Sequence, residues 1–343
     1  MEKNIVYFAE RPGAHYEAQY LIPFLEHTGG LFLTDDRGLL NELRGRYSAR
    51  GDIVVRYGTK EDMLELEKDV AVYSNFYPRG RAGRHILFMH GVADKRGIAR
   101  PYTFKDQASF LYRAAMSLPA NSIFNPLSPG ARAPFKWLRP LIRDRFDLLL
   151  LPGQTLYDLF KKAGTIKRWN YRIIGFPRFD SVFKGEIKRD EVLRKLGLDP
   201  CRKTVLYAPT WHGKHEFNMN SMETMGKAIV KAVHSDLNLI VRPHPRTVTM
   251  GECPDIMAEL RNLSRCTDNI RLVDDPFYDT VKLMASADLM ISDYSSVGIE
   301  FLVFDRPIIY ADHLGGAYAD PQLAEIYVRR AGLIVRVPGN MGR

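Results

Sequence analysis

The chain has 343 residues, enough for two domains at about 150 residues each. Its composition, 45% hydrophobic and 26% charged, is typical of a globular protein and excludes disordered, collagen-like and coiled-coil chains. The net charge of +9 favours a polyanionic partner such as a nucleic acid, an anionic lipid or a phosphorylated substrate, with an incidentally basic protein as the alternative.

The cysteines and the N-terminus indicate a cytoplasmic protein. Cys201, Cys253 and Cys266 have no CxxC spacing, which argues against a disulfide scaffold and a four-cysteine zinc site. The first apolar run ends before Glu10 and Arg11, too early for a signal peptide. No apolar stretch approaches the roughly 18 residues that a membrane span needs, so we expect no span.

Short apolar runs alternate with longer amphipathic stretches along the chain. Continuous rather than alternating hydrophobicity is typical of strands buried on both faces of a parallel sheet. The repeated order of strand and helix predicts doubly wound α/β units. The predicted strands cover residues 4–9, 31–34, 52–57, 70–74, 85–89, 147–151, 171–175, 204–209, 237–242, 269–273, 288–292, 307–311 and 333–337.

Two helices have limits that the sequence indicates. Asp275 and Pro276 form an N-cap and first-turn pair, which predicts a helix running from there toward Ala287. Another helix is predicted over residues 221–234.

The predicted units join near residues 180–190, where a charged helix follows a strand. We therefore expect an N-terminal domain over 1–183 and a C-terminal domain over 184–343, which face a cleft. Ligands should lie at the carboxyl ends of the strands on that cleft.

Residues 99–146 depart from the strand–helix rhythm, because they contain six prolines and many basic residues interleaved with aromatic ones. Basic side chains beside Trp137 can lie on an anionic membrane surface. A partly helical insertion that covers the first domain is an equally good interpretation. Both remain open at this point.

Several common site motifs are absent from the sequence. It has no GxxxxGK[ST] loop, no GxGxxG fingerprint, no DxD and no HExxH, which argues against mononucleotide kinases, simple dehydrogenases and carboxylate-held metals. His212 and His215 have HxxH spacing without an obvious partner ligand, and a metal site there is a minor alternative. We expect neither a metal nor another cofactor.

Two histidine loops follow predicted strands. In MHGVADK, His90 and Gly91 stand at a strand end with Lys95 beyond them, where a histidine suits proton transfer at neutral pH. A structural histidine is the alternative. In RPHP, residues 242–245, two prolines fix the direction of His244 and flanking arginines make the loop a candidate anion clamp or simply a rigid turn.

Two further loops carry hydroxyl groups. Asp293 follows a predicted strand, and Ser295 and Ser296 stand where the next helix should begin, a good seat for a pyrophosphate or an ordinary serine N-cap. In YAPTWHG, residues 207–213, Thr210 is a possible donor and Trp211 is either a stacking surface or part of the core.

In this order the segments resemble one family. HGxxxK at 90–95, GxPRxD at 175–180, YAPTW at 207–211, RxHP at 242–245 and SDYSS at 292–296 follow the pattern of the CDP-glycerol glycerophosphotransferases. These enzymes build the poly(glycerol phosphate) or poly(ribitol phosphate) of teichoic acids and related capsules. The resemblance extends from about residue 85 to residue 312 and is most specific in the SDYSS block with Ala287, Asp288, Pro307 and Tyr310.

The resemblance implies a GT-B fold, in which two Rossmann-like domains face a cleft and the C-terminal domain binds the donor. It implies a membrane-associated enzyme without membrane spans, located in the cytoplasm at the inner face of the cell membrane. The reaction moves glycerol or ribitol phosphate from a CDP-activated donor to a hydroxyl of a lipid-linked or polymeric acceptor and releases CMP.

The resemblance also implies roles for individual residues. His90 matches the proposed general base, His244 the histidine that binds the donor phosphates, and Ser295 and Ser296 the serines at the pyrophosphate. The remaining residues that we assign to donor binding are Gly91, Lys95, Arg178, Thr210, Arg242 and Asp293.

Two other functions remain as alternatives. A nucleotide-sugar glycosyltransferase or UDP-sugar 2-epimerase would share the GT-B architecture, although an epimerase needs carboxylates near the sugar and the loops here are cationic. A basic nucleic-acid-binding protein is supported by charge alone, without a binding motif, so we expect no nucleic-acid partner.

Overall fold

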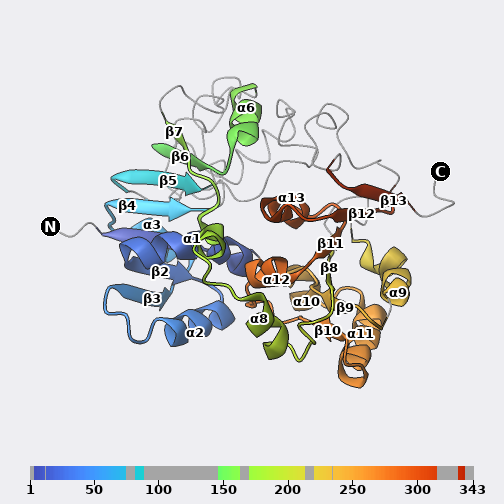
Figure 1. Ribbon diagram of the computed structural model, residues 1–343. Coiled ribbons are helices and arrows are strands. Elements are labelled where there is room, and N and C mark those ends of the chain that lie inside the picture. Colours follow the sequence, from blue (N-terminus) through green and yellow to red (C-terminus); the bar gives the residue numbers. More distant parts are fainter. Residues whose placement is uncertain are drawn as a thin grey trace, which may run out of the picture. The chain divides into compact units, whose positions relative to one another are not determined.

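Figure 1 shows the protein as a computed structural model, which describes residues 4–11, 13–74, 82–88, 146–162, 170–212, 220–233, 235–314 and 331–336. The described residues form two compact units, one that ends at Arg178 and one that begins at Phe179. Of the predicted insertion at 99–146, only Phe146 lies within the described residues.

The N-terminal unit contains one sheet of seven parallel strands. Their order is β3-β2-β1-β4-β5-β6-β7, so the chain starts near the middle of the sheet and winds outward, first to one side and then to the other. The strands are β1 (Ile5–Ala9), β2 (Gly30–Thr34), β3 (Ile53–Tyr57), β4 (Val70–Tyr73), β5 (Arg84–Phe88), β6 (Leu148–Leu151) and β7 (Tyr171–Ile173).

The C-terminal unit has a sheet of six parallel strands in the order β10-β9-β8-β11-β12-β13. Numbered within the unit, this is the Rossmann order 3-2-1-4-5-6. The strands are β8 (Thr204–Ala208), β9 (Asn238–Val241), β10 (Ile270–Leu272), β11 (Leu289–Ser292), β12 (Ile308–Asp312) and β13 (Leu333–Arg336). The two doubly wound sheets confirm the predicted α/β class, and all predicted strands are present with ends shifted by at most two residues.

Helices connect the strands. In the N-terminal unit they are α1 (Ala14–Thr28), α2 (Arg37–Arg46), α3 (Lys60–Glu65), α6 (Gln154–Lys162) and the 3₁₀ turn η2 (Pro177–Phe179). In the C-terminal unit they are α7 (Asp180–Phe183), α8 (Arg189–Lys195), α9 (Met222–Ala232), α10 (Pro245–Thr249), α11 (Pro254–Cys266), α12 (Thr280–Ser286), α13 (Val297–Glu300) and the 3₁₀ turn η3 (Phe301–Phe304). No helix within the described ranges is long and apolar enough to cross a membrane.

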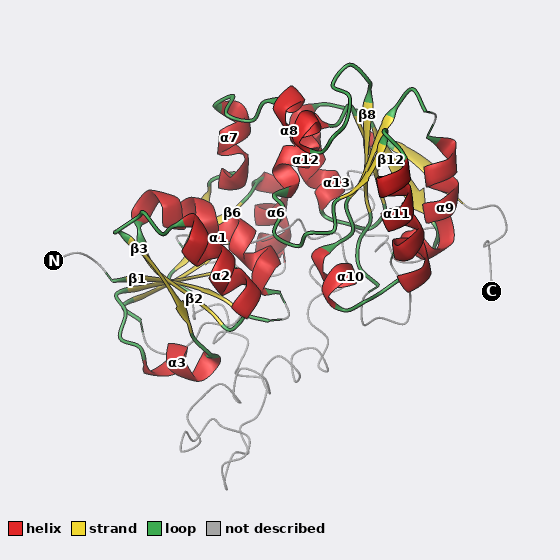
Figure 2. Cartoon of the chain, turned by 90° about the horizontal axis from the view of Figure 1, so that it is seen from below, coloured by secondary structure: helices red, strands yellow, loops and turns green. Residues whose placement is uncertain are grey.

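In the C-terminal unit, α9 and α11 cover one face of the sheet, and α12 and α13 lie on the other (Figure 2). Residues Ile256, Met257 and Leu260 give α11 an apolar stripe that packs on the sheet beside buried Tyr207 and Leu239. Each fully buried aliphatic side chain of this kind stabilises the fold by about 1.5–3 kcal/mol.

Of the two helices whose ends the sequence predicts, one is confirmed and the other begins later than predicted. The helix predicted over 221–234 is confirmed as α9. The predicted start at Asp275 is wrong, because α12 begins at Thr280, with the Asp279 carboxylate accepting a hydrogen bond from the amide of Val281 at 3.0 Å. The Asp275 carboxylate instead accepts from the amide of Phe277 at 2.9 Å and closes a turn.

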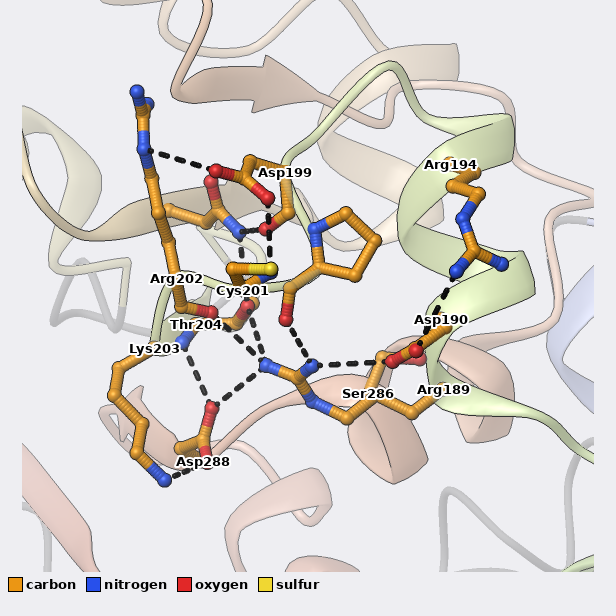
Figure 3. A network of polar contacts seen from close by, with 12 residues as sticks. Arg189, Asp190, Arg194, Asp199, Cys201, Arg202, Lys203, Thr204, Ser286 and Asp288 are labelled. Carbon is orange, nitrogen blue, oxygen red and sulfur yellow. Dashed lines mark hydrogen bonds and ion pairs between the residues drawn. The ribbon is translucent and has the colours of Figure 1, made fainter.

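At the amino ends of β8 and β11, Asp288 holds several segments together (Figure 3). Its carboxylate accepts hydrogen bonds from the Thr204 amide at 2.9 Å, from Arg189 Nη2 at 3.1 Å and from Lys203 Nζ at 2.9 Å. Arg189 also donates to the carbonyl of Pro200 at 2.7 Å. Burial raises the pKa of Asp288, but the hydrogen bonds from Lys203, Thr204 and Arg189 outweigh it and hold that pKa below the ordinary value of 3.8.

Asp288→Asn should therefore lower the free energy of unfolding by about 1–2 kcal/mol at neutral pH, because charge-assisted hydrogen bonds are lost. Since the folded-state pKa is lowered, the carboxylate stabilises the protein fully above the unfolded-state value near 3.8 and loses this effect as the pH falls through the folded-state value. Urea unfolding across pH should show the variant and the wild type converging in acid.

The matched control is Asp268→Asn, which removes a carboxylate whose side chain is 76% exposed and pairs with Arg202. Its effect should stay within about 0.5 kcal/mol. Equal losses in the two variants would contradict the special role of Asp288.

Candidate active site

The candidate site of the C-terminal unit lies at the carboxyl ends of β8 and β11. These strands are neighbours, with Ala208 paired to Ser292, and the strand order reverses between them. At such a switch point the loops of an open parallel sheet leave in opposite directions and form a crevice for ligands. Thr210 follows β8 here, and Asp293 follows β11.

Asp293 is 2% exposed and joins the two sides of the switch point. One carboxylate oxygen accepts from the amide of Thr210 at 2.8 Å, and the other accepts from the amide of Ser221, just before α9, at 2.9 Å. Burial raises the pKa of Asp293, while the hydrogen bonds from Ser221 and Thr210 and the charge of His313 oppose that rise. Both oxygens are thus committed to backbone amides of the protein.

Two buried hydroxyl groups flank this carboxylate. Thr210 is 2% exposed and Ser295 is 7% exposed, and neither hydroxyl makes a hydrogen bond to another residue in the described part of the chain. Ser296 is the N-cap residue of α13, but its side chain forms no capping bond. Because buried hydroxyls usually have partners, Thr210 and Ser295 are well suited to donate to a ligand.

Arg242 follows β9 and is 3% exposed. Its Nη1 donates to the carbonyls of Val273 at 3.0 Å and Asp275 at 2.6 Å, and its Nη2 donates to the carbonyl of Tyr278 at 3.0 Å. These bonds hold the segment between β10 and α12 in a turn, which is also why that helix starts late. In this geometry Arg242 has a structural role, and its predicted contact with the donor stays a prediction.

His244 is the N-cap residue of α10. Its Nδ1 accepts a hydrogen bond from the amide of Arg246 at 3.1 Å. An accepting Nδ1 carries no proton, so the geometry assigns the ring proton of a neutral His244 to Nε2. His244 can therefore donate from Nε2 to an anionic oxygen, and the N-cap fixes the direction from which it does so.

Trp211 brings the β8 loop against the β9 loop. Its ring centroid lies 6.4 Å from that of His244, and the guanidinium carbon of Arg246 lies 4.5 Å from the Trp211 centroid. The second distance is that of a cation–π contact. Trp211 is half-buried rather than part of the core, and its ring contacts Arg246, so its predicted role as a stacking surface for a ligand stays a prediction.

Glu252 fastens the same two loops from below α10. Its Oε2 accepts from the amide of His212 at 3.0 Å and from Thr247 Oγ1 at 3.0 Å. No local pattern of residues indicates the role of this carboxylate, because its partners lie in another loop and on the preceding helix, α10. Glu252 is the main residue of the site that sequence reasoning missed.

Two remaining kinds of chemistry concern potential metal ligands and the Cys253 thiol. No group of three potential ligand side chains is arranged around a common point there, and His215 lies outside those residues. Burial, followed by the nearby charge of Glu223, raises the pKa of the Cys253 thiol to about 12, so this thiol is not a nucleophile at neutral pH.

Arg178 belongs to the N-terminal unit and is 8% exposed. Its Nη2 donates to Gln19 Oε1 at 3.1 Å, and its guanidinium carbon lies 4.9 Å from the Tyr20 ring centroid. These contacts hold the Arg178 side chain against α1, within the N-terminal unit. His90, Gly91 and Lys95 lie outside the described residues, so their predicted roles stay predictions.

The structure thus places five of the predicted site residues just after the carboxyl ends of three strands, β9, β8 and β11, that are neighbours in one sheet: Thr210, His244, Asp293, Ser295 and Ser296. Residues 136–321 match the family of CDP-glycerol:poly(glycerophosphate) glycerophosphotransferases, a match that covers more than half of the chain. The chain belongs to this family.

Characterised members give closer comparisons. The chain is 29% identical over 173 residues to the teichoic acid glycerol-phosphate primase of Bacillus spizizenii, a match covering 50% of the chain and 42% of the primase. It is 28% identical over 198 residues to the teichoic acid glycerol-phosphate transferase of Staphylococcus aureus, covering 51% of the chain and 46% of that transferase. The chain thus matches less than half the length of these relatives.

Among solved structures, the wall teichoic acid polymerase TagF resembles this chain with a TM-score of 0.58 at 17% identity. The superposition covers 97% of this chain and 77% of the polymerase. The likeness shows the fold, which is of the GT-B type with two Rossmann-like domains, as the sequence predicts.

Asp293→Asn should lower the free energy of unfolding by about 1–3 kcal/mol, because an amide nitrogen would face a buried backbone amide that needs an acceptor. The measurement is urea unfolding at neutral pH. Asp274→Asn makes the same change at an exposed carboxylate that pairs with Arg261 and should stay within about 0.5 kcal/mol. A variant of Asp293 as stable as this control would mean that the carboxylate is not needed to join the loops.

Proposed function

We propose that the protein transfers a polyol phosphate, glycerol or ribitol phosphate, from a CDP-activated donor to a hydroxyl of a lipid-linked or polymeric acceptor in teichoic-acid or capsule-type synthesis. The observation that carries the proposal is a cluster of hydrogen-bond donors at the switch point of a Rossmann sheet, in a chain of this family. His244 Nε2 and the hydroxyls of Thr210 and Ser295 all suit a diphosphate.

The names of the relatives support the same substrate class. The matched proteins are teichoic acid primases, transferases and polymerases that act with glycerol phosphate or ribitol phosphate. TagF has also been solved with CDPG. We propose that the C-terminal domain, residues 184–343, binds the donor and that the N-terminal domain, residues 1–183, serves the acceptor.

The proposed reaction is an in-line displacement at the β-phosphorus of the donor. The acceptor oxygen bonds to this phosphorus, the bond to the bridging oxygen breaks, and CMP leaves with the electron pair. His90 takes the proton of the attacking hydroxyl, a contribution of roughly 10²–10⁴-fold. His244, Lys95 and the backbone near Ser295 and Ser296 stabilise charge on the phosphoryl oxygens.

The other proposed donor residues act around this centre. Gly91 allows close approach of the substrate beside His90, and Arg178 and Arg242 remain candidates on the strength of their motifs. Asp293 acts indirectly, because its hydrogen bonds to the amides of Thr210 and Ser221 hold the β8 loop and the start of α9 in place.

The rival enzyme class, a nucleotide-sugar glycosyltransferase or UDP-sugar 2-epimerase, predicts a different donor. The full chain should be incubated with CDP-polyols, CDP-sugars and UDP-sugars and a polyol-phosphate acceptor, and the released nucleotide measured. We expect CMP from a CDP-polyol, also in EDTA. Turnover of a UDP-sugar alone would contradict the proposal, and loss in EDTA that magnesium restores would reveal a metal requirement.

The variant His90→Ala tests, in the same assay, whether His90 acts as the general base. CMP release should fall by at least about 100-fold while CDP affinity stays near that of the wild type, because a general base acts on the acceptor hydroxyl. His27→Ala, at an exposed position at the end of α1, should leave CMP release unchanged. Activity of the His90 variant within about tenfold of wild type would remove it from the role of base.

We also propose that the protein lies in the cytoplasm at the inner face of the membrane, since a lipid-linked acceptor resides there. The basic segment over residues 99–146 would make the contact, although it lies almost wholly outside the described residues. Each basic side chain near an anionic surface contributes about 1 kcal/mol.

Changing Arg139, Arg143 and Arg145 to Glu should abolish sedimentation with anionic liposomes. Binding of the wild type should fade with salt as the Debye length falls below about 10 Å. The matched control changes three exposed lysines of the C-terminal unit, Lys184, Lys188 and Lys195, to Glu and should still sediment. If the arginine variant sediments like the parent, the segment is a structural insertion.

A further inference from the structure

The loop after β9 contains two arginines that occupy different environments. Arg242 is 3% exposed, and its guanidinium is directed at backbone carbonyls between Val273 and Tyr278. A donor phosphate could reach those N–H groups only if the turn before α12 opened. In this geometry Arg242 is therefore not placed to donate to a phosphate oxygen.

Arg246 is half-buried and stands four residues further along, on α10. Its guanidinium carbon lies 4.5 Å from the centroid of the Trp211 ring. A guanidinium that contacts an aromatic ring through its face keeps its N–H donors in its own plane. Such a contact restrains the guanidinium against the Trp211 ring, and a guanidinium can recognise phosphate oxygens in pairs.

The position of Arg246 is tied to that of His244. The amide of Arg246 donates to His244 Nδ1 at 3.1 Å, and the Trp211 ring lies 6.4 Å from the His244 ring. This one hydrogen bond fixes the orientation of the His244 ring, and so of its Nε2–H group, relative to the backbone from which the Arg246 side chain starts. His244 and Arg246 are thus linked by a hydrogen bond and by a shared neighbour, Trp211.

The backbone on both sides of Trp211 is held by hydrogen bonds to buried or half-buried carboxylates. It directly follows Thr210, whose amide is bound by Asp293, and it precedes His212, whose amide is bound by Glu252. The platform under Arg246 is therefore fastened at both neighbouring residues. A rigid platform lowers the entropy lost when the arginine binds an anion.

We infer that Arg246, held on Trp211, is a direct ligand of the donor diphosphate, and that it supplies the positive charge which the sequence attributes to Arg242. This inference rests on the proposed function, because it concerns the CDP-activated donor of the same site. Trp211 acts as a positioning residue, through the arginine, rather than as a stacking surface for the base.

The test measures binding of CDP and CMP by calorimetry, and of cytidine by displacement of CDP. Arg246→Gln should weaken CDP binding by roughly 10- to 100-fold, as expected for hydrogen bonds to a charged group, and leave cytidine binding unchanged. Arg261→Gln, at an exposed arginine of α11 in the same unit, is the matched control and should bind CDP like the wild type.

Trp211→Leu separates positioning from base stacking. If Trp211 acts through Arg246, this variant loses CDP affinity, keeps cytidine affinity, and adds little to the loss in the double variant with Arg246→Gln. If the tryptophan variant loses cytidine and CDP equally, Trp211 stacks on the base and the inference fails. Arg246→Gln is at a half-buried surface position, so it keeps the test open even if Trp211→Leu does not fold.

Two further outcomes separate this inference from the proposed function. If the wild type binds CDP and Arg246→Gln binds it equally well, the inference is overturned and the proposed function stands. If the wild type binds UDP-sugars in place of CDP, the proposed function is wrong, and the same variants titrated with UDP decide whether Arg246 binds the diphosphate.

Discussion

The carboxylate of Asp293 is the contact on which the C-terminal site depends. It accepts from the amides of Thr210 and Ser221 and so joins the β8 loop and the start of α9 to the end of β11. An isolated carboxylate is costly to bury, and these two hydrogen bonds offset the cost. The same bonds fix the position of Thr210 at the switch point.

The two edges of this sheet do different work. At the amino ends of β8 and β11, Asp288 is surrounded by cations and backbone donors that fasten α8 to the sheet (Figure 3). At the carboxyl ends, Thr210 and Ser295 carry hydroxyls that the described residues leave without hydrogen bonds. Both edges thus contain a carboxylate that joins segments of the unit, and the carboxyl edge also carries the hydroxyls suited to binding, as expected for a Rossmann-like unit.

Arg242 and Arg246 have the same side chain but differ in burial and therefore in the contacts that they make. Arg242 is fully enclosed and spends its donors on a turn, whereas Arg246 is half-buried and lies on an aromatic ring. In this geometry Arg242 stabilises the turn before α12, and a direct contact with a diphosphate is proposed for Arg246 instead. It also explains why α12 starts at Thr280, since the turn before it is held by Arg242.

The sequence by itself determined the strands, the α/β class and the position of Ser295 and Ser296 before α13, because apolar runs and helix starts are local signals. The late start of α12 and the partners of Arg242, Trp211 and Glu252 were decided only by the tertiary structure. Asp293 bonds to residues 83 and 72 positions earlier in the chain, and Arg242 to a carbonyl 36 positions later. Such pairs depend on which strands become neighbours, and no local pattern of residues records the order of strands in a sheet.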